Sequence, residues 1–195
     1  MSKERQHRPA EPHSRPSDRE LVTATLAGDQ NAFDELVERY QGKIYNLALG
    51  VTGNSHDAMD ATQAAFLKIY ENLSRFDPAH RFFSWLYRIS LNEALNIVNR
   101  NRRFTPLDEE AATEAADPER RSAGREIGRA LRETLGELKP ELRVTIILRH
   151  FHGLSYAEMS EVIGIAPKTV KSRLFAARRE MRHRLLAKGV ARSGR

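Results

Sequence analysis

The sequence predicts an all-α protein of two helical domains, a four-helix N-terminal lobe and a C-terminal helix-turn-helix lobe. Apolar side chains recur at steps of three and four residues over most of the chain, which is typical of amphipathic helices. No segment shows the two-residue alternation of a half-buried strand. Between the helical regions, residues 104–117 lose this periodicity and are rich in acidic residues and alanine, which indicates a flexible linker.

The ends of the chain lie outside both predicted domains. Residues 1–16 hold three prolines and almost no large apolar side chain, so we expect a disordered leader. Residues 189–195 form a short tail. The predicted domains are therefore residues 17–103 and 118–188.

The first domain begins with a short helix and a long one. Ser17 is followed three residues later by Glu20, and this capping box predicts a helix through about Ala27. From Asn31, an apolar stripe predicts a second helix that ends at Gly53.

Two more helices complete the first domain. Asn54 or Ser55 can cap a third helix that reaches about Leu73. A fourth is expected from about Phe82 to Arg103, after a turn that contains a proline. Its predicted core stripe consists of Trp85, Leu86, Ile89, Leu95 and Val98.

The second domain contains a helix-turn-helix pattern. Weak periodicity predicts a helix in residues 118–137, and a further helix should begin at Pro140 and stop at Gly153. A capping box then starts at Ser155, and a tight turn at Gly164 leads to a helix whose first residue is Pro167. A short helix, a glycine turn and a longer helix are typical of DNA-binding domains.

The charges are unevenly distributed along the chain. Residues 139–195 carry 13 basic and 4 acidic side chains, whereas residues 1–103 are nearly neutral. The last helix concentrates cations around the turns that a recognition helix would place in the major groove. This pattern favours a nucleic acid as the partner of the second domain, against the alternative of a helical hairpin with a solvated basic face.

Composition excludes several other classes. The chain has no cysteine, so it has no disulfide framework, thiolate nucleophile or cysteine-ligated zinc. No apolar run approaches the roughly 20 residues that span a bilayer, and no signal peptide is recognisable, so we expect no membrane insertion and a cytoplasmic protein. His150 and His152 alone make a poor metal site, and no catalytic constellation or phosphate-binding glycine loop is present. We therefore expect no enzyme, no metal and no cofactor.

Three blocks of sequence resemble the extracytoplasmic-function (ECF) sigma factors, small bacterial transcription initiation factors. The stretch DAMDATQAAFLK at 57–68 is similar to their polymerase-binding helix, and FSWLYRISLN at 83–92 to their promoter-melting helix. The helix-turn-helix at 154–174 is similar to their second DNA-binding domain. The pattern departs at Met59 and Ala64, often glutamate in the family, and at Ala61, often leucine.

The resemblance implies that the protein binds core RNA polymerase, at its β′ clamp and β flap, and directs it to promoter DNA. Asp57, Asp60 and Gln63 are the expected clamp contacts, and their three-residue spacing places them on one helical face. Many family members are held inactive by an anti-sigma factor, which is a further expected partner.

The resemblance also implies two sets of promoter contacts. For the −10 element, where the family captures an unpaired base, they are Phe76, His80, Arg81, Phe82, Phe83, Asn92 and Arg100. The alternative for most of the aromatic residues among them is a place in the core. For the −35 element they are Lys168, Thr169, Lys171, Ser172, Arg173, Phe175, Arg178 and Arg179. The alternative is a conventional helix-turn-helix regulator, whose first domain would be a sensor or dimerisation domain.

Overall fold

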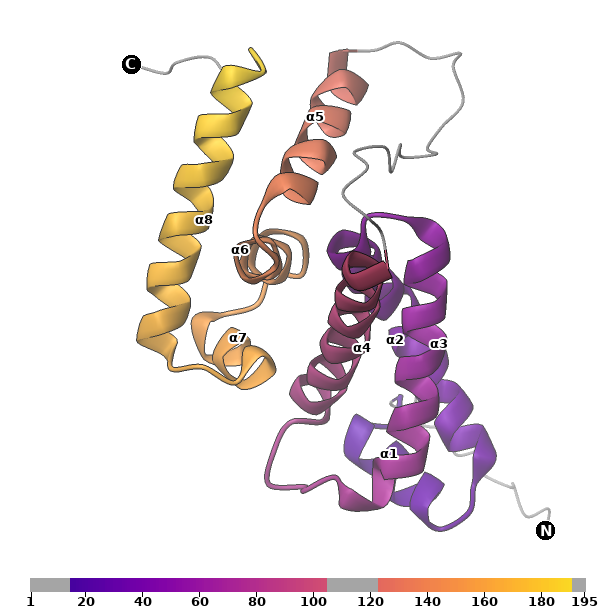
Figure 1. The fold of residues 1–195 in the computed structure, drawn as a ribbon. Coiled ribbons are helices and arrows are strands. Elements are labelled where there is room, and N and C mark those ends of the chain that lie inside the picture. Colours follow the sequence, from indigo (N-terminus) through magenta and orange to yellow (C-terminus); the bar gives the residue numbers. More distant parts are fainter. Residues whose placement is uncertain (1–14, 105–122, 191–195) are drawn as a thin grey trace, which may run out of the picture.

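The computed structural model describes residues 15–104 and 123–190, and every regular element in these ranges is helical (Figure 1). The predicted all-α class is confirmed for the described residues. Most of the predicted leader, linker and tail lies outside them. The first lobe comprises α1 (Asp18–Leu26), α2 (Gln30–Thr52), α3 (Ser55–Asn72), the short 3-10 helix η1 (Leu73–Arg75) and α4 (Phe82–Phe104). The second lobe comprises α5 (Ala123–Glu137), α6 (Pro140–Ile146), the π-helical turn η2 (Ile147–Phe151), α7 (Tyr156–Ile163) and α8 (Pro167–Ala187).

The first-lobe helices begin and end where the sequence predicts. Ser17 and Glu20 form the capping box of α1, in which the Ser17 amide donates to Glu20 Oε2 at 2.7 Å. Gly53, with φ of 86°, ends α2 in the left-handed conformation that favours glycine. The Asn54 side chain accepts the Asp57 amide at 2.8 Å and caps α3.

Helices α2, α3 and α4 form a bundle, and α1 packs on α2 (Figure 1). Leu36, Ile44 and Leu47 from α2 are fully buried against Ile69 of α3 and Leu86 of α4. The apolar stripes of α2 and α3 thus build the core of this lobe.

Helix α4 buries a wider face than the sequence indicates. Of the predicted stripe only Leu86 is fully buried, and the other four side chains are half-buried. Instead Ser84, Tyr87 and Leu91 are buried. The physical reason is that α4 lies between the first-lobe bundle and α7 of the second lobe, so two of its faces are covered.

The second lobe departs from prediction at one point. Its helix from Pro140 does not run as an α-helix to Gly153 but continues from Ile147 as a π-helical turn, in which the His152 amide donates to the Ile147 carbonyl at 3.2 Å. Helices α5 and α8 of the same lobe lie side by side (Figure 1), and Leu135, Leu174 and Met181 belong to the core that they share.

The two lobes pack against each other. Val144, Ile147 and Leu148 of the second lobe belong to the same apolar cluster as the first-lobe core. Gly50 of α2 permits the close approach, because a Cβ there would lie 3.1 Å from Ile147 Cδ1. The described residues therefore form one compact body with α7 docked on α4.

Candidate functional site

The turn between α7 and α8 has helix-turn-helix geometry. Ser155 and Glu158 form the capping box of α7, with the Ser155 amide 2.9 Å from Glu158 Oε2. Gly164, with φ of 76°, ends α7 in the left-handed region, and Pro167 opens α8. Buried Val170 of α8 belongs to the same apolar cluster as Met159 and Val162 of α7. The local structure predicted from the sequence is confirmed.

Helix α8 exposes almost all of the side chains predicted to contact the −35 element. Seven of the eight are exposed and Arg173 is half-buried. Phe175 is 69% exposed, which is unusual for a phenylalanine and leaves its ring free for contact with a ligand. Arg178 Nε donates to His150 Nε2 at 3.2 Å. Burial, together with the cations Arg178 and Arg149, lowers the pKa of His150.

Helix α4 carries a polar stripe that includes two predicted −10 contacts. Asn92 and Arg100 are exposed and lie eight residues apart, which places them on one side of the helix. Arg88, Asn96 and Asn99 are also exposed at the same helical spacing, and the sequence reasoning missed them. The recurrence of Asn and Arg at steps of three and four residues is the signal that could have identified this stripe.

The aromatic residues before and within the start of α4 require a correction. Phe76 and Phe82 are only 9% and 5% exposed, and their ring centroids lie 5.5 Å apart in an edge-to-face contact within the core. The prediction that these two rings stack on a DNA base does not fit this structure. Phe83 is half-buried, with its ring centroid 4.2 Å from that of Tyr87.

His80 and Arg81 remain exposed in the same segment. Arg81 Nη1 forms an ion pair with Glu158 Oε1 of α7 at 2.7 Å. These two side chains, rather than the buried rings, are the part of this segment that a DNA strand could reach.

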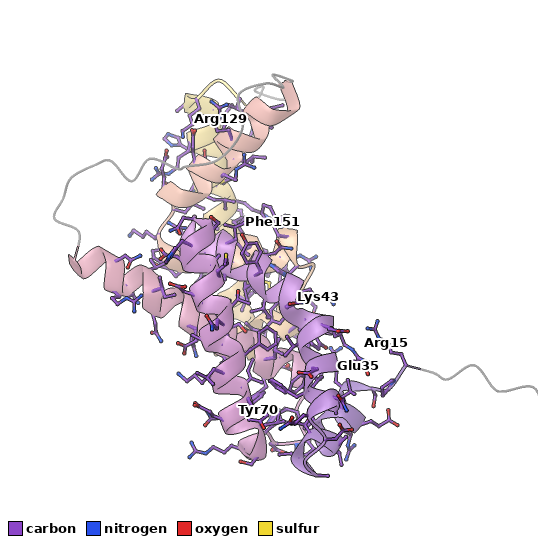
Figure 2. All side chains as sticks on the ribbon, turned by 90° about the vertical axis from the view of Figure 1, so that its right-hand side faces the viewer. Arg15, Glu35, Lys43, Tyr70, Arg129 and Phe151 are labelled. Carbon is purple, nitrogen blue, oxygen red and sulfur yellow. The ribbon has the colours of Figure 1, made fainter. Side chains whose placement is uncertain are left out.

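The three predicted polymerase-binding residues of α3 differ in how exposed their side chains are. Asp60 and Gln63 are exposed. Asp57 is half-buried, and its Oδ2 accepts from Asn54 at 2.7 Å and from Asn101 of α4 at 2.8 Å, so it also joins α3 to α4. The sequence reasoning missed three apolar side chains that α3 exposes, namely Met59, Leu67 and Tyr70. Figure 2 shows Tyr70 near the lower end of this lobe.

The comparisons with known proteins agree with this arrangement. Residues 36–104 match the model of Sigma-70 region 2, and residues 128–181 match that of Sigma-70, region 4. The chain is 37% identical over 175 residues to the RNA polymerase sigma-H factor of Pseudomonas aeruginosa, an alignment that covers 83% of this chain and 90% of that one. It is 35% identical over 174 residues to the ECF RNA polymerase sigma-E factor of Escherichia coli, covering 83% and 91%. The chain belongs to the ECF sigma factors.

Solved structures show the same fold. CnrH in complex with the cytosolic domain of CnrY superposes with a TM-score of 0.68 at 30% identity, covering 87% of this chain and 97% of that one. The sigma factor RpoE of Bartonella quintana, solved with the anti-sigma factor NepR, gives 0.61 at 20% identity, covering 78% and 96%. As a sigma factor, the chain binds RNA polymerase and promoter DNA and directs promoter-specific transcription initiation.

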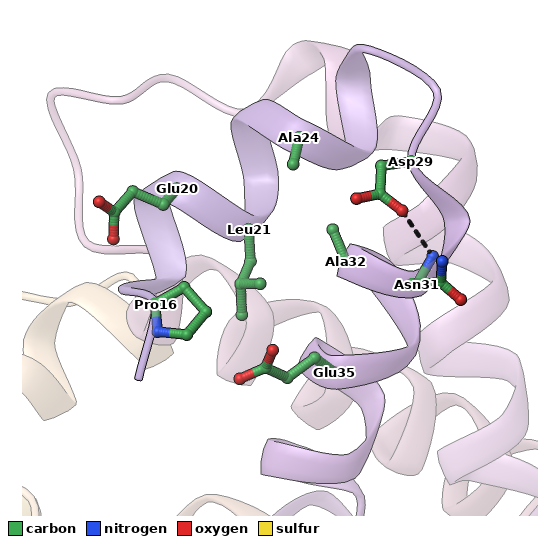
Figure 3. Close-up of a pocket in the computed structure, with 8 residues that line it drawn as sticks. All are labelled: Pro16, Glu20, Leu21, Ala24, Asp29, Asn31, Ala32 and Glu35. Carbon is green, nitrogen blue, oxygen red and sulfur yellow. Dashed lines mark hydrogen bonds between the residues drawn. The ribbon is translucent and has the colours of Figure 1, made fainter. Parts of the chain in front are cut away.

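The described part of this sigma factor contains no group of three or more His, Asp or Glu side chains that could hold a metal ion. None of its helices is long and apolar enough to cross a membrane. A shallow hollow of about 330 Å³ lies between α1 and α2 (Figure 3), but its carboxylates already serve the fold. Asp29 caps α2, Glu20 belongs to the capping box of α1, and Glu35 pairs with Arg39 at 2.8 Å.

Proposed function

We propose that this sigma factor divides promoter recognition between its lobes, with α8 on the −35 element and α4 on the −10 element. The observation that supports this division is the placement of two separate exposed polar surfaces, one on each of these helices. On α8, Lys171, Ser172, Arg173 and Phe175 would read or flank the −35 bases. Lys168, Thr169, Arg178 and Arg179 would mainly hold phosphates.

On the first lobe, Asn92 is the proposed reader of a −10 base, because its amide can both donate and accept a hydrogen bond. His80, Arg81 and Arg100 would hold the strand near it, and half-buried Phe83 could stack on a base only if its ring rotated outward. Strand opening would then be driven by the capture of unpaired bases, without ATP and without any catalytic step by this chain.

The polymerase-binding surface would be the exposed face of α3. Asp60 and Gln63 offer hydrogen bonds to the β′ clamp, and Met59, Leu67 and Tyr70 offer apolar contact beside them. A second contact, between the second lobe and the β flap, would hold α8 over the −35 element. Because the polymerase works on the chromosome, we place the protein in the bacterial cytoplasm. Residues 104–117 would serve as the tether between domains 17–103 and 118–188.

The test is reconstitution of transcription from purified parts. Core RNA polymerase with this protein, and no other factor, should initiate at a defined start site on a cognate promoter. A variant with Asp60→Ala and Gln63→Ala should lose binding to core polymerase but retain its helical circular dichroism spectrum. As a matched control, Asn46→Ala removes an exposed polar side chain from α2 and should change neither. Equal binding of core polymerase by all three proteins would contradict the assignment of α3.

A further inference from the structure

The contact between the lobes is made of a short series of polar bonds around an apolar centre. From α4 and the residue before it, Arg81 pairs with Glu158 at 2.7 Å and Ser84 donates to Glu161 at 2.6 Å. Further along α4, the Tyr87 hydroxyl lies 3.0 Å from His152 Nδ1. On the α2 side, Arg143 Nη1 donates to the Val51 carbonyl at 2.7 Å.

Of these bonds, the one between Tyr87 and His152 is the most enclosed. Tyr87 is 1% exposed, and its ring meets the His152 ring edge-to-face with centroids 5.5 Å apart. The other imidazole nitrogen, His152 Nε2, is buried and has no hydrogen-bond partner among the described residues. The site therefore accommodates a neutral imidazole, and a protonated ring would carry a charge with no anion bonded to it.

The charged groups around His152 do not favour a proton on it. From α2 the facing group is the Lys43 ammonium, and from α4 it is the Tyr87 hydroxyl. On its own segment Arg149 and His150 precede it, and the carboxylates of α7 are engaged with Arg81 and Ser84. Burial and, secondarily, the positive charge of Lys43 lower the pKa of His152 below its ordinary value of 6.5. Figure 2 shows Lys43 and neighbouring Phe151 on the same side of the molecule.

We propose that the lobe contact is a proton-sensitive latch, in which neutral His152 holds the second lobe on α4 through Tyr87 and protonation of His152 releases it. The direction follows from linkage. In the separated lobes His152 meets water and regains an ordinary pKa, so the open form binds the proton more tightly. The ratio of closed to open form is therefore highest above pH 6.5, and it falls by up to about tenfold per pH unit between 6.5 and the lowered pKa of His152 in the closed form.

The closed form has to open for the protein to engage both promoter elements. Positions −35 and −10 are about 25 base pairs apart, which is roughly 85 Å of duplex at 3.4 Å per pair. A compact chain of this size has a radius of gyration of only about 16 Å. Fully extended, residues 105–122 could span up to about 60 Å, enough to let the lobes separate. A latch at this contact would therefore control the first step of promoter binding, a property that the promoter contacts alone do not imply.

The experiment measures the separation of the lobes in the free full-length protein, without polymerase or DNA. Because the chain has no cysteine, Glu71→Cys on α3 and Ala187→Cys on α8 provide two unique sites for a donor and an acceptor dye. Energy transfer and small-angle X-ray scattering are followed from pH 8 to pH 5 at constant ionic strength. We expect high transfer at pH 8 and a fall, with a larger radius of gyration, below pH 6.5.

Three variants assign the response to His152. His152→Gln keeps a neutral hydrogen-bonding side chain and should remain closed throughout the pH range. Lys43→Gln removes the nearby cation and should give a weaker response, because the closed-state pKa of His152 moves back toward 6.5. His183→Gln removes an exposed histidine from α8 and should respond like the parent protein. Circular dichroism at each pH shows whether the helices stay folded.

Each outcome decides the proposal. Closure that persists in the parent protein down to pH 5 overturns it, and so does an equal pH response in the parent and in His152→Gln. If His152→Gln does not close at pH 8, Lys43→Gln, which keeps the imidazole and removes only the nearby cation, replaces it in the comparison, and an equal pH response in the parent and in Lys43→Gln then overturns the proposal. A latch also requires Tyr87→Phe, which keeps the ring and removes only the hydroxyl, to be more open than the parent at pH 8, where the parent is closed. Failure of the promoter assignments would leave all of these measurements unchanged.

Discussion

Arg81 and Glu158 lie 77 residues apart in the sequence, yet their side chains form an ion pair of 2.7 Å between the two lobes. Glu158 also accepts the Ser155 amide in the capping box of α7. The hydrogen bonds that Glu158 accepts from the Ser155 amide and hydroxyl lower its pKa, and Arg81 makes a smaller contribution in the same direction. One carboxylate thus serves both a helix end and the lobe contact, and substitutions can separate the two roles.

We predict that Glu158→Gln weakens the lobe contact but costs little stability. Glutamine can replace glutamate in a capping box, and the Arg81 side chain is 67% exposed, so the lost ion pair is worth less than about 1 kcal/mol. Ser155→Ala, in contrast, removes the cap of α7 and should cost about 1 kcal/mol of unfolding free energy. Thermal unfolding measures the loss of stability in each variant. If Glu158→Gln destabilises the protein as much as Ser155→Ala does, the ion pair contributes more than we predict.

The stabilisation that the Glu158 carboxylate provides should depend on pH in a known direction. Because the pKa of Glu158 is lowered in the folded protein, its stabilisation is complete above its ordinary value of 4.5 and is lost as the pH falls through the lowered value. The parent protein should therefore lose more stability than Glu158→Gln between pH 5 and pH 3. Urea unfolding at a series of pH values measures this, and parallel curves for the two proteins would contradict it.

Alanine substitutions at Gly164, in the turn of the helix-turn-helix, and at Gly42, within α2, form a matched test of the turn geometry. Gly164→Ala forces a φ of 76° on a residue with a Cβ, which would also lie 3.0 Å from Arg88 Nη2, and should cost about 1–2 kcal/mol. Gly42→Ala lies within α2, where a Cβ meets no described atom within 4 Å, and should stabilise by about 0.5–1 kcal/mol. Opposite shifts in the unfolding midpoint are the expected result. A stabilised Gly164→Ala would show that the turn does not require its left-handed geometry.

Much of the fold could be predicted from the sequence because local signals specify it. Capping boxes at Ser17 and Ser155, and glycines at 53 and 164, define helix ends through interactions within a few residues. The second buried face of α4 could not be predicted, since it depends on α7, which is distant in sequence. For the same reason the sequence pattern could not distinguish Phe76 and Phe82, whose rings pack in the core, from His80 and Arg81, whose side chains are exposed.

On α8, substitutions should distinguish base contacts from phosphate contacts. Lys171→Ala and Arg173→Ala should change the preference among −35 sequences, since a good base contact is worth roughly 1–3 kcal/mol of discrimination. Arg178→Ala should weaken binding to all sequences alike and reduce the salt slope by about one. Binding of permuted −35 duplexes at several salt concentrations measures both effects. An unchanged preference in Lys171→Ala and Arg173→Ala would mean that a different face of α8 meets the bases.

On α4, Asn92→Ala should impair promoter opening more than promoter binding. If Asn92 captures an unpaired base, its loss removes a contact that forms only after the strands separate. A template with a premelted −10 bubble removes the cost of separation and should restore most of the transcription that Asn92→Ala loses on a duplex promoter. Asn96→Ala, one turn further along the exposed stripe, tests how far that contact extends, and Asn46→Ala on α2 is the control that should match the parent on both templates. Multiple-round transcription on the two templates, with circular dichroism to verify folding, provides the measurement. If Asn92→Ala loses the same fraction of activity on the bubble as on the duplex while its fold is intact, Asn92 does not act by capturing a base during strand opening.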